Sequence, residues 1–480
     1  LGFPWGGGSG YVQEVSDFCQ KAADGSFPVA DKMIEVMDYY GFDGYFFNQE
    51  SYGCSEEIAT RLNEMIHYMH AKRPDMLISW YDSMISSGGV SYQDAVNSYN
   101  KSWMEPNEDG IWGVDEFFMN YNWSASKIGT TINTLKSIGR SQFDAFAGID
   151  VQQNCMDTYF RDHLLVDEDG LAKLSLALYY VNQTITMAKD GENFHKTEQD
   201  YYVNTKGDPR DTSANLNSSA WAGLSRFFAE KTPITAAPFV TDFNSGHGTG
   251  YYVDGALSRD AEWSYQSNQD VMPTWTWIID ATATKLSGDY DFTDAYNGGN
   301  SIKFYGNLNG RNDILLYSTD IAVENKMSLS LTAKGGLENA SLVAYLDDGT
   351  AESYADCEQV VTALANGEGW VETKVDLSAY AGKTLKAIGL KIEGNAADYQ
   401  INLGRIAVLD KTRAALNGPD SFFLDEIMYA DAYTAEARIQ WAKVTGAASY
   451  EIKVGDKTFT VTGTSFDLTK AEGLAMTVGE

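Results

Sequence analysis

The sequence predicts an α/β fold: a (β/α)8 barrel of the TIM type whose N-terminal strands are missing, followed by β-sandwich modules. Residues 1–284 alternate short apolar runs with segments of helical period, which is typical of βα units and a parallel sheet. Beyond residue 285 the helical periods give way to alternating strands separated by Gly, Asn and Asp turns. The expected domains are a barrel over 1–284, a jelly-roll-like sandwich over 285–412 and a partial β-module over 418–480.

The first domain has too few strands for a closed barrel. A barrel needs eight, so we expect the first two βα units to be missing and Leu1 to lie in the third strand. An open doubly wound sheet is the alternative, because it explains six strands without truncation. The six expected strands are Leu1–Trp5, Gly44–Glu50, Leu77–Asp82, Glu116–Trp123, Ala145–Val151 and Ile234–Phe243.

The segments between these strands carry apolar residues at helical spacing. Gly41 and Pro74 follow two of them and are typical of helix ends. The expected helices are Asp31–Tyr40, Glu56–Ala71, Lys127–Ile138 and Leu171–Met187.

Short strands fill the rest of the chain. The third module stops at residue 480 before a full sandwich is complete, so both ends of the chain are expected to be cut. The expected strands are Ser301–Tyr305, Asp313–Ser318, Lys326–Leu331, Ala340–Leu346, Val371–Asp376, Ala387–Ile392, Gln400–Val408, Ala437–Trp441, Ser449–Val454, Thr458–Val461 and Ser465–Leu468.

Composition excludes several function classes. Lys plus Arg number 35 and Asp plus Glu number 67, and the net charge of −32 repels nucleic acid and anionic membranes. No apolar run approaches the ~18 residues of a membrane span. The four cysteines form neither a zinc motif nor a disulfide framework, and we expect no metal or other cofactor. Aromatic residues make up 13% of the chain and suit either a large core or stacking on sugar rings.

The run Gly41–Glu50 contains the clearest candidate for chemistry. Asn48 and Glu50 are two residues apart on a strand, so their side chains share a face, which at the end of a barrel strand is the pocket. Most glycosidases use two carboxyl groups, but substrate-assisted enzymes use the 2-acetamido oxygen of the sugar as nucleophile and need one acid and one orienting polar group. Glu50 suits the first role and Asn48 the second.

The motif Phe42-Asp-Gly-Tyr-Phe-Phe-Asn-Gln-Glu50 resembles the catalytic strand of family 85 glycoside hydrolases, the endo-β-N-acetylglucosaminidases. Family 18 chitinases are the nearest rival; Asp43 and Glu50 fit the outer positions of their Asp-x-x-Asp-x-Asp-x-Glu strand, but Phe46 and Asn48 occupy the inner two. Further motifs follow in the family order: Trp80–Ser83, Asn120–Trp123, Gly148–Asp150, Pro233–Thr235, Pro238–Gly248 and Pro273–Trp277.

The resemblance implies retaining hydrolysis of the GlcNAcβ1-4GlcNAc bond in the N-glycan core through an oxazolinium ion. It implies that Glu50 is the acid/base, that Asn48 orients the acetamide and that Tyr81 contacts the reacting sugar. The segment Val151–Cys155 departs from the family pattern of an aromatic residue, Gly and Arg, which puts any carried-over role of this loop in doubt. The expected substrate-binding residues are Trp5, Trp80, Asp82, Asn120, Tyr121, Asn122, Trp123, Asp150, Asn244 and His247.

Two alternatives stay open: a family 18-type chitinase, and a non-catalytic carbohydrate-binding protein on a degenerate barrel. The sandwich resembles galactose-binding-like modules, and the last segment resembles a fibronectin type III module with Trp441 and Tyr450 in its core. Tandem β-modules favour a secreted or cell-surface bacterial enzyme acting on the N-glycans of glycoproteins. We expect structural roles for His67 and His70, a turn at Asp167–Gly170, and packing roles for Trp275 and Trp277.

Overall fold

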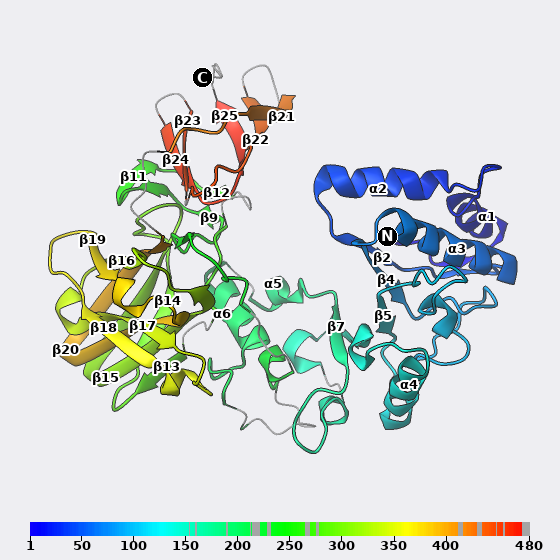
Figure 1. Cartoon of the computed structure of the whole chain (residues 1–480), viewed down its shortest axis with the longest axis horizontal. Helices are drawn as coiled ribbons and strands as arrows, with labels where there is room; N and C mark the ends of the chain where they lie inside the picture. Colours follow the sequence, from blue (N-terminus) through cyan, green and yellow to red (C-terminus); the bar gives the residue numbers. More distant parts are fainter. Residues whose placement is uncertain are drawn as a thin grey trace. The chain divides into compact units, whose positions relative to one another are not determined.

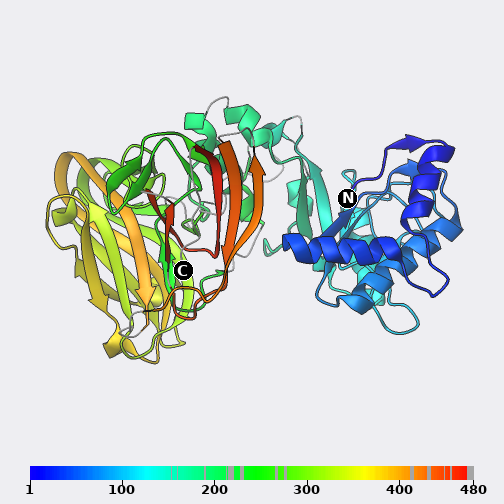
Figure 2. The same cartoon turned by 90° about the horizontal axis from the view of Figure 1, so that it is seen from above.

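The computed structural model describes all residues of the chain except 153, 159–160, 189–190, 212, 214–220, 228–231, 265–268, 275–277, 411–415, 430–433, 448, 455–456 and 473–480. The chain forms two compact units (Figures 1 and 2). The first comprises Leu1–Lys206 with Arg210–Ala229, and the second comprises Gly207–Pro209 with Glu230–Glu480. No helix of the described residues is long and apolar enough to cross a membrane.

A five-stranded parallel sheet is the centre of the first unit. Its strand order, β2-β4-β5-β6-β7, follows the order of the chain. A doubly wound sheet reverses its order at a switch point, whereas consecutive parallel strands are the arrangement in an arc of a barrel. The strands are β2 (Gly44–Phe47), β4 (Leu77–Tyr81), β5 (Glu116–Met119), β6 (Ala145–Asp150) and β7 (Ser175–Tyr179).

Four helices cover only one face of this sheet. Buried side chains of α1 to α4 pack against the strand residues that point to the same side, among them Phe47, Trp80 and Phe117. Figure 1 shows α1, α2 and α3 gathered beside β2 and β4. The opposite face carries the side chains described below as the lining of a cavity. The helices are α1 (Ser9–Phe18), α2 (Pro28–Tyr40), α3 (Glu56–Lys72), α4 (Ala125–Ser137), α5 (Gln183–Ala188) and α6 (Gly191–Tyr202).

The segment at the start of the chain runs beside the end of β2. Gly2 forms a parallel bridge with Asn48, and the Phe3 amide donates to the Asn48 carbonyl at 2.9 Å. Beyond this bridge, β1 (Gly6–Gly7) pairs in parallel with β3 (Ser51–Tyr52). Backbone pairing therefore supports the Asn48–Tyr52 segment after β2 itself has ended.

The second unit is built around a β-sandwich. Its nine-stranded sheet is antiparallel and organised by β20, which pairs with four other strands. Leu, Ile and Val side chains from these strands fill its core. The strands are β8 (Phe239–Thr241), β13 (Ile278–Ala281), β14 (Ser287–Asp291), β15 (Ser301–Ala322), β16 (Ser328–Lys334), β17 (Ala340–Asp347), β18 (Glu358–Ala363), β19 (Val371–Asp376) and β20 (Thr384–Leu409).

A smaller β-module follows the sandwich within the second unit. Trp441 is 6% exposed in its core, with the Tyr450 ring 5.3 Å away, and Tyr251 and Trp263 belong to the same cluster. Its strands are β21 (Phe422–Tyr429), β22 (Thr434–Trp441), β23 (Tyr450–Val454), β24 (Lys457–Val461) and β25 (Ser465–Glu472); two short hairpin-like pairs precede the sandwich, β9 (His247–Gly248) with β12 (Trp263–Ser264) and β10 (Tyr251–Val253) with β11 (Ala256–Arg259).

The predicted strands are found at β2, β4, β5 and β6 and the predicted helices at α2, α3 and α4, but three predicted elements are wrong. The segment 171–187 contains β7 and only part of the short helix α5, instead of one long helix. The segment 234–243 contributes β8, which pairs with β20 antiparallel in the sandwich sheet and not with the parallel sheet. The segment 1–5 makes a single bridge and no regular strand.

The domain boundaries at 284 and 412–418 stay predictions. The chain divides into its two units between residues 206 and 230, because everything from Glu230 onward, β8 included, belongs to the second unit. The motif at Trp275–Trp277 lies outside the described residues.

The backbone of β6 at Gly148 lies so close to the neighbouring strand β5 that a side chain would not fit there. A Cβ at this position would lie 2.2 Å from the Met119 carbonyl oxygen and 2.5 Å from the Phe118 ring. Gly148→Ala is therefore expected to lower the free energy of unfolding by about 2 kcal/mol or more, because the backbone cannot move aside cheaply. Urea unfolding followed by circular dichroism measures this.

The matched control is Gly129→Ala in α4, where an added Cβ meets no atom within 4 Å. Since alanine is favoured over glycine inside a helix, this variant is expected to gain about 0.5–1 kcal/mol. An unchanged urea midpoint for Gly148→Ala beside a stabilised Gly129→Ala would contradict the steric account of β6.

Candidate active site

Strand β2 and the residues after it present two polar side chains to one face. The backbone remains extended past Phe47, so successive side chains alternate: Phe47, Gln49 and Ser51 are buried, whereas Asn48 and Glu50 are half-buried on the opposite side. The Ser51 amide donates to Gln49 Oε1 at 2.5 Å, which anchors the backbone on both sides of Glu50. The sequence therefore fixes the direction of Asn48 and Glu50 through the residues that flank them.

Asn48 and Glu50 line a cavity of about 790 Å³ in the first unit. It lies on the sheet face that α1 to α4 leave uncovered. Its lining combines aromatic rings with few polar groups, which is the usual chemistry of a site for a sugar-sized ligand. The lining residues are Trp5, Phe46, Asn48, Glu50, Ser79, Tyr81, Glu116, Phe118, Tyr121, Phe146, Leu176, Ala177, Leu178 and Tyr179.

Both carboxylate oxygens of Glu50 accept hydrogen bonds from neutral donors. Asn48 Nδ2 donates to Oε2 at 3.1 Å, and the Tyr92 hydroxyl donates to Oε1 at 2.5 Å. Asn48 Oδ1 is buried and accepts no hydrogen bond from the described part of the chain. Asn48 thus offers a free acceptor beside a carboxylate, and a ligand N–H is the donor that such a group needs.

A second carboxylate lines the cavity, but it lies too far from Glu50 to act with it. Glu116 is level with Ser79 on the neighbouring strand, and Ser79 is level with Phe46, four residues before Glu50. Four residues of extended chain span about 13 Å. A retaining pair of carboxyl groups is only ~5–5.5 Å apart. The Ser79 hydroxyl donates to Glu116, which gives this carboxylate a local partner.

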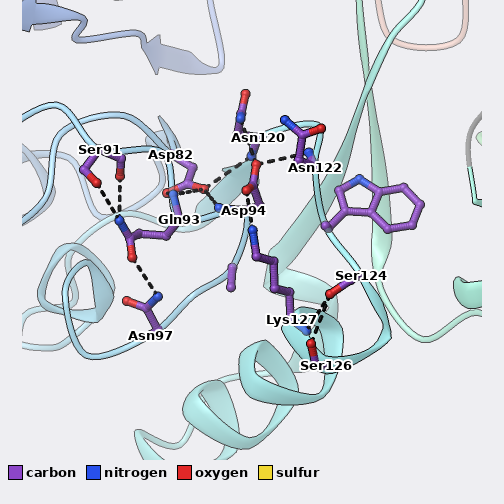
Figure 3. Close-up of polar contacts among 12 residues, drawn as sticks. Asp82, Ser91, Gln93, Asp94, Asn97, Asn120, Asn122, Ser124, Ser126 and Lys127 are labelled. Carbon is purple, nitrogen blue, oxygen red and sulfur yellow. Dashed lines mark hydrogen bonds and ion pairs between the residues drawn. The ribbon is translucent and has the colours of Figure 1, made fainter.

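Tyr81 is level with Phe118 on β5 and is 7% exposed in the cavity wall. Its hydroxyl donates to Asn120 Oδ1 at 2.7 Å, and Asn120 Nδ2 donates to Asp94 Oδ1 at 2.8 Å. Figure 3 shows Asn120 and Asp94 in contact, with Lys127 paired to Asp94 from below. Burial raises the pKa of Tyr81 well above its usual value, so this hydroxyl stays neutral at physiological pH.

Asp82 organises the loop that follows β4. Asp82 is 1% exposed, and its carboxylate accepts from the backbone amides of Gln93, Asp94 and Asn120 (Figure 3). It also accepts from Asn100 Nδ2 at 3.1 Å. Burial raises its pKa to about 7, although these donors oppose the shift. Asp82 holds the loop and the start of the segment after β5; it does not line the cavity.

The predicted substrate-binding residues divide into three sets. Trp5 and Tyr121 line the cavity with Tyr81. Trp80 and Trp123 are 0% and 1% exposed and lie in the core, where Trp80 stacks on Trp103 at 3.9 Å. The predicted ligand contacts of these two tryptophans are corrected. Strand alternation turns Trp80 away from the cavity, and Trp123, beyond the end of β5, is buried with its indole N–H donating to the Gly148 carbonyl at 2.9 Å. 

The remaining predicted residues lie behind or outside this cavity. Asn120 supports Tyr81, Asn122 donates its backbone amide to Asp94, and Asp150 is exposed at the end of β6. Asn244 and His247 belong to the second unit, where Asn244 Oδ1 accepts from two backbone amides and His247 stacks on Phe292 at 5.0 Å.

Sequence reasoning missed Tyr92, the second donor to Glu50. It lies in a loop without strand or helical pattern, so no periodicity marked it, although its neighbours in the Ser91–Asp94 run suit a turn. His67 and His70 of α3 bond to backbone carbonyls, and His70 also to Asp115, in agreement with structural roles. 

Comparison with known proteins places this site in a family. The family model for glycosyl hydrolase family 85 matches residues 1–251. The glycoside hydrolase domain of Endo-D from Streptococcus pneumoniae R6 is 34% identical with a TM-score of 0.87, covering 98% of this chain and 76% of that one. 

Curated relatives include two proteins named cytosolic endo-beta-N-acetylglucosaminidase. The one from Danio rerio is 23% identical over 437 residues, which cover 83% of this chain and 57% of that protein. The one from Mus musculus is 25% identical over 365 residues, which cover 71% and 44%. The chain thus spans about half the length of these relatives.

These names overturn the expected location. A secreted or cell-surface bacterial enzyme was expected from the tandem β-modules, whereas the curated relatives are named cytosolic and come from eukaryotes. The β-modules carry no information on location, because a sandwich folds in any compartment. The resemblance first noted in the strand of Asn48 and Glu50 is confirmed, because the family model matches more than half of the chain. The chain belongs to glycosyl hydrolase family 85.

Proposed function

We propose that this chain is an endo-β-N-acetylglucosaminidase that hydrolyses the GlcNAcβ1-4GlcNAc bond in the core of N-glycans. Family membership and the names of the relatives support the activity. The observation that carries the mechanism is the pair Asn48 and Glu50 on one face. Asn48 donates to one Glu50 oxygen, and its own carbonyl receives no hydrogen bond from the residues that the structure describes. The parallel sheet is proposed to be an arc of a (β/α)8 barrel.

The first step needs one acid and one acceptor. Glu50, carrying a proton, gives it to the glycosidic oxygen as the bond to the anomeric carbon breaks. The carbonyl oxygen of the substrate's own 2-acetamido group attacks that carbon from the other side. The acetamide N–H donates to Asn48 Oδ1, and this bond strengthens as positive charge spreads onto the nitrogen of the oxazolinium ion.

In the second step Glu50 accepts a proton instead of donating one. Glu50, now a carboxylate, takes a proton from water while the water oxygen attacks the anomeric carbon and the oxazolinium ring opens. The two displacements together retain the configuration. No protein carboxylate forms a covalent bond, in keeping with the distant position of Glu116.

The aromatic lining is proposed to bind the sugar rings. Tyr81 is proposed to contact the reacting sugar, with its hydroxyl held by Asn120. Trp5 is 70% exposed at the cavity, and Tyr121 lies 6.4 Å from the Tyr81 ring. Both are proposed to stack on neighbouring sugar faces.

Glu50→Gln is expected to reduce hydrolysis of a high-mannose glycopeptide by about 10²–10⁴-fold or more, because an amide cannot protonate the leaving oxygen. Release of glycan is measured by mass spectrometry. The matched control is Glu116→Gln, the same change in the same cavity, which is expected to keep most of the activity. Equal activity of wild type and Glu50→Gln, or equal loss in both variants, contradicts the assignment of Glu50.

Asn48→Ala is expected to impair hydrolysis of the natural glycan much more than transfer from a preformed oxazoline donor. The oxazoline arrives with its ring closed, so the orienting contact, worth about 2.7–4 kcal/mol in such sites, is no longer needed. Both reactions are followed by chromatography of the products. Glu50→Gln provides the comparison, since it loses the base that transfer still requires. Equal loss of both reactions in a folded Asn48→Ala protein disagrees with this division of roles.

A further inference from the structure

Glu50 receives a hydrogen bond from outside its own strand. The Tyr92 hydroxyl donates to Oε1 at 2.5 Å, while Asn48 occupies Oε2. The Tyr92 ring also lies 6.0 Å from the ring of Tyr81, which lines the cavity, so the loop brings Tyr92 beside the proposed catalytic group. No other hydrogen bond to Glu50 comes from the described residues outside the 48–50 segment.

The loop holds Tyr92 on both sides. The Ser91 amide donates to the Ser83 carbonyl at 2.7 Å, and the Gln93 amide donates to Asp82 at 3.1 Å. Asp94 follows in a left-handed conformation with φ of 52°, and its carboxylate binds Asn120 and Lys127 (Figure 3). Non-glycine residues adopt this conformation at a cost, and they retain it where the surroundings fix it. The backbone at Tyr92 is therefore fixed by buried polar contacts.

We propose that Tyr92 is a positioning residue for the reaction proposed above: its hydroxyl holds the Glu50 carboxyl group in place beside Asn48. This inference rests on the proposed function of Glu50. Tyr92 does not exchange a covalent bond with the substrate. It donates one hydrogen bond, which restricts the carboxyl group to one orientation, so that the same group is in place for the proton transfers of both steps.

Several other titratable side chains lie near Glu50 and Tyr92. Burial raises the pKa values of Tyr81, Tyr92 and Tyr121, so all three are neutral at physiological pH. Asp82, behind the loop, has a pKa raised by burial to about 7. Asp150 faces Tyr121, and Tyr52 of β3 interacts with the Tyr92 hydroxyl. A pH-dependent NMR signal at Tyr92 can therefore arise from Glu50 or from Asp82. Substituting Glu50 distinguishes the two sources.

The hydrogen bond itself is tested without any substrate. Full-length protein carrying 3-fluorotyrosine at position 92 is titrated by ¹⁹F NMR, together with the same protein bearing Glu50→Gln. The expected result is a pH-dependent shift that disappears in Glu50→Gln; a shift that survives belongs to Asp82. 3-Fluorotyrosine at position 99, on the same loop and 59% exposed, is expected to show no such step. A titration at position 92 that Glu50→Gln leaves unchanged overturns the proposal.

The positioning role is tested by kinetics. Tyr92→Phe keeps the ring and removes the donor; it is expected to lower kcat about tenfold with KM within about twofold. A merely structural role would not separate kcat from KM in this way. Tyr99→Phe is expected to match wild type. A Tyr92→Phe protein with the wild-type kcat overturns the proposal.

The two experiments separate this inference from the function on which it rests. A wild-type chain that releases no glycan contradicts the proposed function, and the ¹⁹F titration still decides whether Tyr92 bonds to Glu50. An active wild type whose kcat is unaltered by Tyr92→Phe leaves the proposed function standing and removes the role of Tyr92.

Discussion

The alternation of side chains along one extended segment is the constraint on which the candidate site depends. Phe47, Gln49 and Ser51 enter the core, so Asn48 and Glu50 must enter the cavity. A slip of one residue would exchange the two sets and bury a carboxylate among apolar groups. The pairing of Asn48 with the segment at Gly2 extends this control beyond the end of β2, where the two polar residues lie.

Around this strand the chain uses buried polar groups to shape loops rather than to perform chemistry. Asp82 and Asp94 are both nearly inaccessible. Asp82 accepts from backbone amides of the turn that follows β4, and Asp94 binds the Asn120 side chain, the Asn122 amide and Lys127 (Figure 3). Together they determine where Tyr92 and Asn120 point. The cavity itself contains few charges, while the hydrogen bond from Tyr92 to Glu50 is exposed to solvent.

Much of the first unit could be predicted from the sequence, because apolar runs of four to six residues followed by helical periods indicate βα units. Asn48 and Glu50 could be paired from their spacing alone. The strand β7 was missed because Ser175–Tyr179 is a short apolar run that a helix would accommodate equally well. The partner of β8 could not be read from its residues, since a short apolar strand does not encode whether its neighbour is parallel. Trp80 and Trp123 were assigned to the cavity by residue type, whereas strand alternation places Trp80 in the core and the turn after β5 buries Trp123.

The central claim is that the substrate's acetamide, oriented by Asn48, is the nucleophile. The most direct measurement is the hydrolysis rate of N-glycan substrates in which that acetamide, on the GlcNAc whose anomeric carbon reacts, carries one, two or three fluorine atoms. Fluorine withdraws electrons from the carbonyl oxygen, so the account predicts a rate that falls steeply with each fluorine. A rate that is independent of fluorination would show that another group attacks the anomeric carbon and would contradict the account.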